Sequence, residues 1–154
     1  MSGGPPGKRW HTREDSGIRL DREGRWWHDD ELIEHPRIIE AFNTGLVPTD
    51  DGRFKLVFGW DWCFVEVEDA AYRVVTVDVG ESSVALRLTD RSVEPLDPST
   101  LSLDPDGVLS CRVKEGRAKA RFTRDAQFEL GSRMEERRGA IVLLLSGREY
   151  PIAQ

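Results

Sequence analysis

The chain consists largely of short runs in which apolar and polar residues alternate, with glycine and aspartate between the runs. A period of two places successive side chains on opposite faces of a β-strand. Glycine or aspartate between two such runs predicts a tight turn, and the runs Ile18–Leu20 and Trp26–His28 flank one at residues 21–24. The pattern therefore predicts a mostly antiparallel sheet built from hairpins.

Two segments show helical spacing instead. Pro36 suits the first turn of a helix, where its missing N–H costs nothing, and Gly45 suits the end of that helix. A second helix is predicted from Arg124 to about Met134, with Thr123 as its N-cap and its apolar residues on one face. Together with the strands, these two helices predict an α+β fold.

A motif of the first half of the chain returns in the second half. The pattern Ile18-x-Leu20-Asp21-x-x-Gly24 recurs as Leu101-x-Leu103-Asp104-x-x-Gly107, and a predicted helix follows each copy. The repetition predicts an internal duplication of a hairpin–helix–hairpin unit, whose two copies pack together because each is small for an independent core. We therefore predict a disordered leader over residues 1–16, an N-terminal repeat half over 17–90 and a C-terminal repeat half over 91–154.

Composition narrows the classes of partner. The 154 residues include 22 basic and 28 acidic side chains, which give a net charge of −6 and argue against a nucleic-acid polymer as partner. The longest apolar run, Ala140 to Leu145, is far shorter than the ~20 residues of a bilayer-spanning helix. The first residues carry no apolar stretch of the kind a secretory signal needs. We therefore predict a cytoplasmic protein without a membrane partner.

No arrangement of residues predicts catalysis. The chain lacks a Gly-x-Ser-x-Gly elbow, a cysteine with an activating histidine nearby and a phosphate-binding glycine loop. Glu66 and Glu68 alternate with valines, as on a solvated strand face. Cys63 and Cys111 lie in apolar runs, where a free thiol is usually a small core residue. We predict neither enzymatic activity nor a cofactor.

The densest group of metal-ligand types is His28-Asp29-Asp30-Glu31, followed by His35. Strand alternation places His28 and Asp29 on opposite faces, and acidic residues before a helix also favour its positive end. The sequence alone therefore predicts no metal site.

The tryptophans and one basic hairpin are the candidate binding features. Trp26 and Trp27 must point to opposite faces of their strand, so one indole of the pair lies outside the core of its own half. Such an indole either covers the other half of the chain or marks a surface for a protein partner. From Arg112 to Arg124 the chain carries six basic residues against one acid, Glu115.

A turn at Glu115-Gly116 pairs Arg112 with Lys119 and places Arg121 opposite Ser110, with these four side chains facing outward. Basic side chains on such a hairpin either protect an exposed edge or bind an anion. We predict that Arg112, Lys119 and Arg121 form an anion-binding surface.

Several motifs resemble the bacterial family called domain of unknown function 1285. In the first half they are Asp21-x-x-Gly24-x-Trp26-x-His28, Ile33-x-x-Pro36-Arg37-Ile38-Ile39-x-x-Phe42 and Val65-Glu66-Val67-Glu68-Asp69-Ala70. The second half agrees more weakly, through Arg121-Phe122-x-Arg124, Phe128-Glu129-Leu130 and Ser146-Gly147-x-x-Tyr150-Pro151-Ile152. The chain departs from the family at Phe58-Gly59-Trp60-Asp61, where a Thr-Pro turn is usual, and at Ala71, where proline is usual.

The resemblance implies a duplicated α+β fold whose C-terminal half is superficially like a pleckstrin-homology domain. It also implies a small-ligand site between the halves, suited to a nucleotide-like anion in signalling. With Trp26 and His28 of the family motif, the basic residues Arg112, Lys119 and Arg121 are the residues we assign to that site. The alternative function is a protein-interaction or scaffold domain with no small-molecule ligand.

Overall fold

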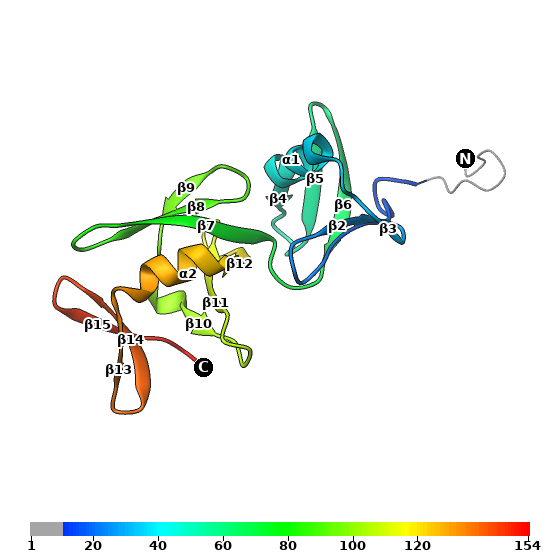
Figure 1. The fold of residues 1–154 in the computed structure, drawn as a ribbon. Helices are drawn as coiled ribbons and strands as arrows, with labels where there is room; N and C mark the ends of the chain where they lie inside the picture. The colour runs from blue at the N-terminus through cyan, green and yellow to red at the C-terminus, as the bar shows by residue number, and fades with distance from the viewer. Residues whose placement is uncertain (1–10) are drawn as a thin grey trace. The chain divides into compact units, whose positions relative to one another are not determined.

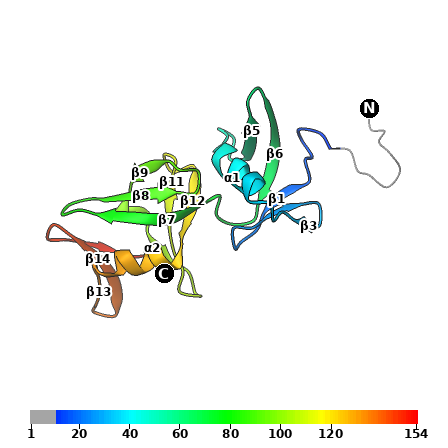
Figure 2. The same cartoon turned by 45° about the horizontal axis from the view of Figure 1, so that its top comes forward.

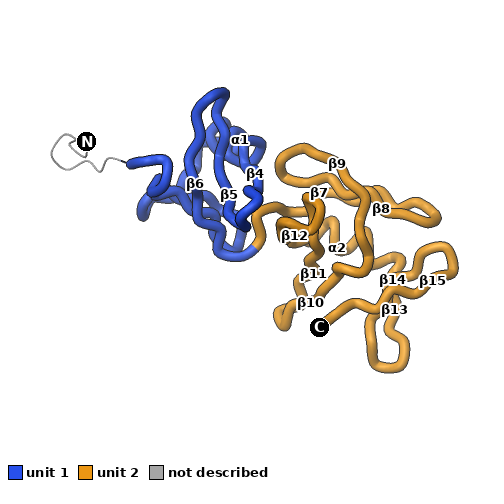
Figure 3. Tube along the Cα trace, turned by 180° about the vertical axis from the view of Figure 1, so that it is seen from behind, with its two compact units in different colours: residues 1–69 blue, residues 70–154 orange. Residues whose placement is uncertain are grey.

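The computed structural model describes residues 11–154. The chain divides into two compact units, Met1–Asp69 and Ala70–Gln154, which Figure 3 shows in different colours. The described part is an α+β structure with mostly antiparallel pairing, as predicted. The division falls between Asp69 and Ala70 instead of after residue 90, because the strands that follow residue 70 pair within the second unit.

Unit 1 contains one six-stranded sheet in the order β3-β2-β1-β6-β5-β4 (Figure 1). Two three-stranded meanders meet at its centre, where β1 and β6 run parallel and Leu20 pairs with Val67. All other pairings in this sheet are antiparallel, as short hairpins require. The strands are β1 Ile18–Leu20, β2 Trp26–His28, β3 Glu31–Leu32, β4 Leu46–Pro48, β5 Phe54–Phe58 and β6 Asp61–Val67.

The helix of unit 1, α1, spans Pro36–Gly45, as predicted. His35 is its N-cap and accepts the Arg37 backbone N–H at Nδ1 over 3.2 Å. The last residue of the helix, Gly45, lies close to the backbone of β5. A Cβ atom added at Gly45 would lie 2.8 Å from the carbonyl oxygen of Val57. Only glycine allows this close approach of helix and strand backbones.

The core of unit 1 is small and centred on Trp26, which is only 1% exposed. The Trp26 indole N–H donates to Asn43 Oδ1 at 2.8 Å, and its ring meets Phe42 edge-on at 5.3 Å. Trp27 is half-buried and makes its polar contact elsewhere, with Asp21. The predicted alternation, with Trp26 buried and Trp27 on the opposite face, is confirmed.

Unit 2 contains a second six-stranded sheet, in the order β10-β11-β12-β7-β8-β9. Two meanders again meet through a parallel central pair, here β12 and β7, where Ala120 pairs with Tyr72. A short 3-10 helix, η1 Pro98–Thr100, connects β9 to β10. The strands are β7 Tyr72–Val79, β8 Val84–Leu88, β9 Val93–Pro95, β10 Ser102–Leu103, β11 Leu109–Val113 and β12 Ala118–Phe122.

The second helix, α2, spans Arg124–Gly131 and packs against β7 and β12 (Figure 2). Thr123 is the N-cap, as predicted, and its hydroxyl accepts the Ala126 N–H at 3.2 Å. The helix ends earlier than predicted, because Met134 begins the next strand. A separate three-stranded sheet follows, made of β13 Met134–Arg137, β14 Ala140–Leu145 and β15 Arg148–Pro151. In residues 11–154, no helix has the length and apolar content to span a bilayer.

Candidate functional site

Basic side chains from three adjacent strands of unit 2 share one face of its sheet. Arg112 of β11 pairs with Lys119 of β12, and Arg121 of β12 pairs with Arg73 of β7. Paired residues point to the same face of a sheet, as do residues two positions apart on one strand. These four residues therefore form one patch, which we call the basic face. The predicted register of the hairpin is confirmed at all four of its pairs.

The opposite side chains of the same hairpin form part of the core of unit 2. The core residues are Cys111, Val113, Ala118 and Ala120, each 1% exposed or less. Burial raises the pKa of the Cys111 thiol to about 12, so the reactive thiolate is disfavoured there. The pKa of the Cys63 thiol in unit 1 is also raised, again mainly by burial. Both thiols are therefore poor nucleophiles.

The members of the basic face differ in exposure. Arg112 is exposed, and its guanidinium donates from Nη2 to the carbonyl oxygen of Gly116 at 3.0 Å. Arg121 is only 7% exposed, and its Nη2 lies 3.5 Å from Asp106 Oδ2. The prediction that Ser110 and Arg121 face solvent is wrong, because tertiary packing buries both, Ser110 to 4% exposure. The hairpin pattern predicts on which face of the sheet a side chain lies, but it does not predict whether other parts of the chain bury that side chain.

The cavity of unit 1 has an acidic lining, in contrast to the basic face of unit 2. Its volume is about 510 Å³. Five carboxylates and two guanidinium groups reach the lining, and Arg53 is paired with Glu14 at 2.9 Å. Such a lining attracts cations and repels anions. The charged lining residues are Glu14, Asp15, Arg19, Asp29, Asp30, Arg53 and Glu66.

The two remaining predicted site residues, Trp26 and His28, belong to unit 1. Trp26 is a core residue, and its single N–H is already used by Asn43. His28 is exposed at the end of β2, and its ring centroid lies 4.8 Å from that of His11. The structure thus places His28 beside His11, which lies in the predicted leader.

His11 was missed because residues 1–16 read as a disordered leader. Residues 1–10 lie outside the described part, but residues 11–16 follow β6 closely. The Phe64 backbone N–H donates to the carbonyl oxygen of Arg13 at 2.7 Å, and the Ser16 hydroxyl donates to the carbonyl oxygen of Phe64 at 2.6 Å. Leader residues 11–16 are therefore part of unit 1. Backbone pairing of this kind needs no apolar pattern, so the sequence carried no signal for it.

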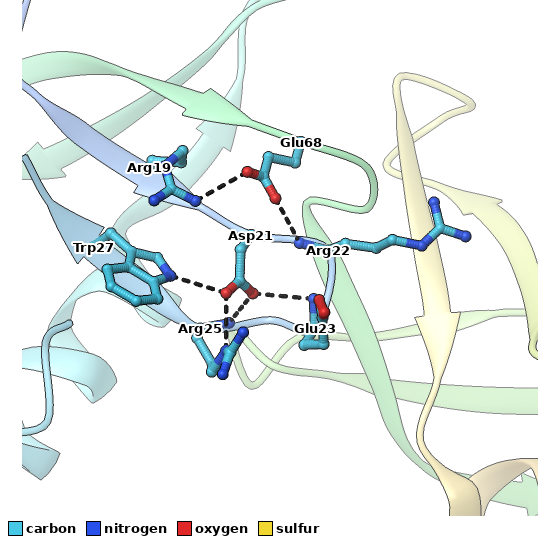
Figure 4. A network of polar contacts seen from close by, with 7 residues as sticks. All are labelled: Arg19, Asp21, Arg22, Glu23, Arg25, Trp27 and Glu68. Carbon is cyan, nitrogen blue, oxygen red and sulfur yellow. Dashed lines mark hydrogen bonds and ion pairs between the residues drawn. The ribbon is translucent and has the colours of Figure 1, made fainter. Parts of the chain in front are cut away.

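A buried carboxylate organises the first hairpin of unit 1 (Figure 4). Asp21 is 4% exposed, and its carboxylate accepts hydrogen bonds from the Trp27 indole, the Arg25 side chain and the backbone N–H groups of Glu23 and Arg25. Burial by itself raises the Asp21 pKa, but the hydrogen bonds from Trp27 and Arg25 outweigh it and hold the pKa below the ordinary value of 3.8. Asp21 is thus a structural anion.

Next to this hairpin, Glu68 connects two strands of unit 1. Its carboxylate accepts from Arg19 Nη1 at 2.9 Å and from the Arg22 backbone N–H at 3.1 Å (Figure 4). The motif residues Asp21 and Glu68 therefore have structural partners within the unit. Their arrangement explains the spacing of the motif without requiring a ligand.

An α+β protein assembled from three-stranded meanders is the class that these observations define. Residues 5–70 match the model of the N-terminal domain of the family described as domain of unknown function DUF1285. The resemblance of this chain to that family is thereby confirmed. Among curated proteins, none matches the chain.

Two solved structures are similar in fold. A DUF1285 family protein from Silicibacter pomeroyi DSS-3 is 22% identical with a TM-score of 0.68, over 91% of this chain and 81% of that chain. A DUF1285 family protein from Shewanella baltica OS155 is 16% identical with a TM-score of 0.56, over 76% of this chain and 91% of that chain. At these identities the likeness concerns the fold alone.

Proposed function

We propose that the chain is a ligand-binding module without enzymatic activity, and that the basic face of unit 2 binds a small anion such as the phosphate group of a nucleotide. The observation that carries the proposal is the register, which brings Arg112 opposite Lys119 and Arg121 beside Arg73. Like charges directly opposite on one sheet face are unfavourable by up to about 1 kcal/mol. A bound anion relieves that repulsion.

The chemistry of the side chains suits phosphate. Guanidinium groups present paired N–H donors that match two oxygens of a phosphate, and Arg121 sits where little water competes. The guanidinium of Arg112 is held by the neutral carbonyl group of Gly116, so this contact leaves its positive charge in place. A nucleotide ligand would agree with the role in signalling that the family resemblance implies.

We further propose that the chain is internally duplicated. The order meander, helix, meander occurs over β1 to β6 and again over β10 to β15. The parallel pairing of β1 with β6 has a reduced counterpart in the single parallel bridge between Ser102 and Ala153. These features support the repeat, while the likeness of the C-terminal half to a pleckstrin-homology domain stays a prediction.

A thermal-shift titration of the full chain with pyrophosphate, mononucleotides and cyclic dinucleotides tests anion binding. A ligand that binds only the folded state stabilises it by RT ln(1 + L/Kd), where L is the free ligand concentration, so Tm rises with the logarithm of L once L exceeds Kd. We expect a shift with at least one phosphate compound and its loss in Arg112→Gln/Arg121→Gln. The matched control is Arg148→Gln, which removes an exposed arginine of β15 in the same unit. An unchanged shift in the double variant would contradict the proposal.

A second candidate function, protein interaction, is favoured by a different observation. Trp60 is 93% exposed at the turn between β5 and β6, and Val57 and Phe58 beside it are 37% and 41% exposed. Exposed aromatic side chains next to one another are typical of partner surfaces. This apolar turn is the feature that distinguishes a scaffold domain from a small-ligand module.

A further inference from the structure

We propose that His11, His28 and Asp29 of unit 1 bind a divalent transition-metal ion. Each residue offers one ligand atom, and these atoms all lie within 4.8 Å of one another. His11 Nε2 is already 3.1 Å from Asp29 Oδ2. In a tetrahedral site with bonds of ~2.1 Å, neighbouring ligand atoms are about 3.4 Å apart, so a ligand atom at 4.8 Å needs to move by about 1.4 Å.

Both ring nitrogens of His11 face an oxygen atom. Its Nδ1 lies 3.3 Å from the carbonyl oxygen of Asp15, while its Nε2 faces the Asp29 carboxylate. A neutral imidazole has a single N–H, so it satisfies one of these two oxygens and directs a lone pair at the other. A metal ion between Nε2 and Oδ2 resolves the conflict. The Nδ1–H donated to a backbone carbonyl is then the outer contact that orients many metal-binding histidines.

The backbone around the cluster is built for this close approach. Gly17 has φ +73°, and a Cβ atom there would lie 2.4 Å from Asp29 Oδ1 and 2.7 Å from His11 Cε1. Asp29 itself is in the left-handed region with φ 54°, and its N–H donates to the Gly17 carbonyl oxygen at 2.7 Å. This conformation breaks the strand alternation that would have separated Asp29 from His28. It is the reason that the sequence pattern predicted no metal site.

The acidic residues around the cluster favour a cation, and the ligand types of the cluster favour a transition metal. Asp29 also lines the acidic cavity, whose carboxylates lower the energy of a positive ion at its wall. Two imidazoles and one carboxylate suit Zn²⁺ and similar transition metals, whereas Mg²⁺ and Ca²⁺ prefer oxygen ligands alone. Three protein ligands leave a coordination position for water or for an external ligand. The proposed site is distinct from the basic face, which lies in unit 2.

The test is isothermal titration of the full chain with ZnCl₂, and separately with MgCl₂, after treatment with a chelator. We expect saturable binding of Zn²⁺ at one ion per chain and no comparable binding of Mg²⁺. His11→Gln removes the imidazole nitrogens, and Asp29→Asn keeps the shape of the side chain but removes its charge. Each should weaken Zn²⁺ binding at least ~100-fold, since even outer-shell changes cost 10–100-fold. Circular dichroism of each variant checks that it is folded.

His35→Asn is the matched control, because the chain has three histidines and His35 is the one outside the cluster. Asparagine preserves the N-cap that His35 provides for α1. This variant should bind Zn²⁺ like the original chain. If Zn²⁺ does not bind, or if the three variants bind it equally well, the cluster is a histidine–aspartate hydrogen bond without a metal ion and the proposal is overturned.

Discussion

The two units share a sheet plan but differ in what holds them together. Each has two meanders joined by a parallel central pair, β1 with β6 in unit 1 and β7 with β12 in unit 2. Among the buried apolar side chains of the described residues, only Leu20, Trp26, Leu46 and Leu56 belong to unit 1, and all the others belong to unit 2. Unit 1 therefore depends more on polar contacts than unit 2.

The contrast extends to charge. Unit 1 presents an acidic cavity with two histidines close by, whereas one sheet face of unit 2 gathers arginine and lysine. One strand plan thus supports surfaces of opposite sign, because side chains facing away from the core are free to change without disturbing the register. If the comparison is right, single polar substitutions should affect the two units separately and unit 1 more severely.

The largest effect is expected from Asp21→Asn. Oδ2 accepts from the Trp27 indole and the Arg25 side chain, and Oδ1 accepts from the backbone N–H groups of Glu23 and Arg25. Asparagine replaces one of these oxygens by an NH₂ group, so two donors lose their acceptor. We expect the free energy of unfolding of unit 1 to fall by about 3 kcal/mol. All five tryptophans lie at or before residue 62, so tryptophan fluorescence during urea unfolding monitors unit 1 alone.

Asp78→Asn is the control for this experiment, because Asp78 is an exposed aspartate of β7 in unit 2. It should leave the fluorescence transition unchanged. The pH dependence gives a second readout. Since the folded Asp21 pKa is held below the ordinary value of 3.8, its contribution is present above that value and is lost as pH falls further. The acid-induced loss should be smaller in Asp21→Asn, and an equal loss would contradict the assigned role.

Unit 2 has a half-buried ion pair of its own, which sharpens the comparison. Lys114 Nζ lies 2.5 Å from Asp90 Oδ2 and 2.9 Å from Ser92 Oγ, and it sits over the Tyr72 ring at 5.0 Å. Burial raises the Asp90 pKa, but the hydrogen bonds from Lys114 and Ser92 outweigh burial and lower it. Lys114→Met should cost about 2 kcal/mol in unit 2, because it leaves a half-buried carboxylate without its cation.

Hydrogen exchange of the β7 to β12 amides measures that loss, while tryptophan fluorescence should not change. Adding Asp90→Asn to Lys114→Met removes the orphaned charge and should restore part of the stability. A double variant as unstable as the sum of both single variants would show that the pair is not coupled. A shift of the fluorescence transition would show that the units do not respond separately.

Local features of this fold could be predicted from the sequence. The turn and alternation around residues 110–121 predicted all four pairs of β11 with β12, and Pro36 and Gly45 predicted the bounds of α1. Each of these depends on residues near one another in the chain. The alternation of Trp26 and Trp27 was predictable for the same reason.

Long-range features could not be predicted. The parallel pairing of β7 with β12 joins strands that are far apart in the chain, and no local pattern indicates it or the division into compact units at Asp69 and Ala70. Arg121 is buried by tertiary packing that the hairpin pattern does not record. The cluster at His11 depends on hydrogen bonds to β6 and on the positive φ of Asp29, neither of which has a hydrophobic period.

The smallest effect on stability is expected from Trp60→Ser, although Trp60 is the most exposed of the large apolar side chains described. At 93% exposure the indole contributes little buried area, so the free energy of unfolding should change by no more than about 0.5 kcal/mol. Trp26→Phe is the opposite case, because it removes the buried indole that donates to Asn43 and should destabilise unit 1.

If the apolar turn binds a protein, cross-linking in the native cell extract should capture a partner with the original chain and with Phe128→Ser. The Trp60→Ser chain should capture none. Phe128 of α2 is the control because it is 84% exposed in the other unit. Equal capture by both variants would exclude the turn as the contact surface and leave Trp60 as a solvated turn residue.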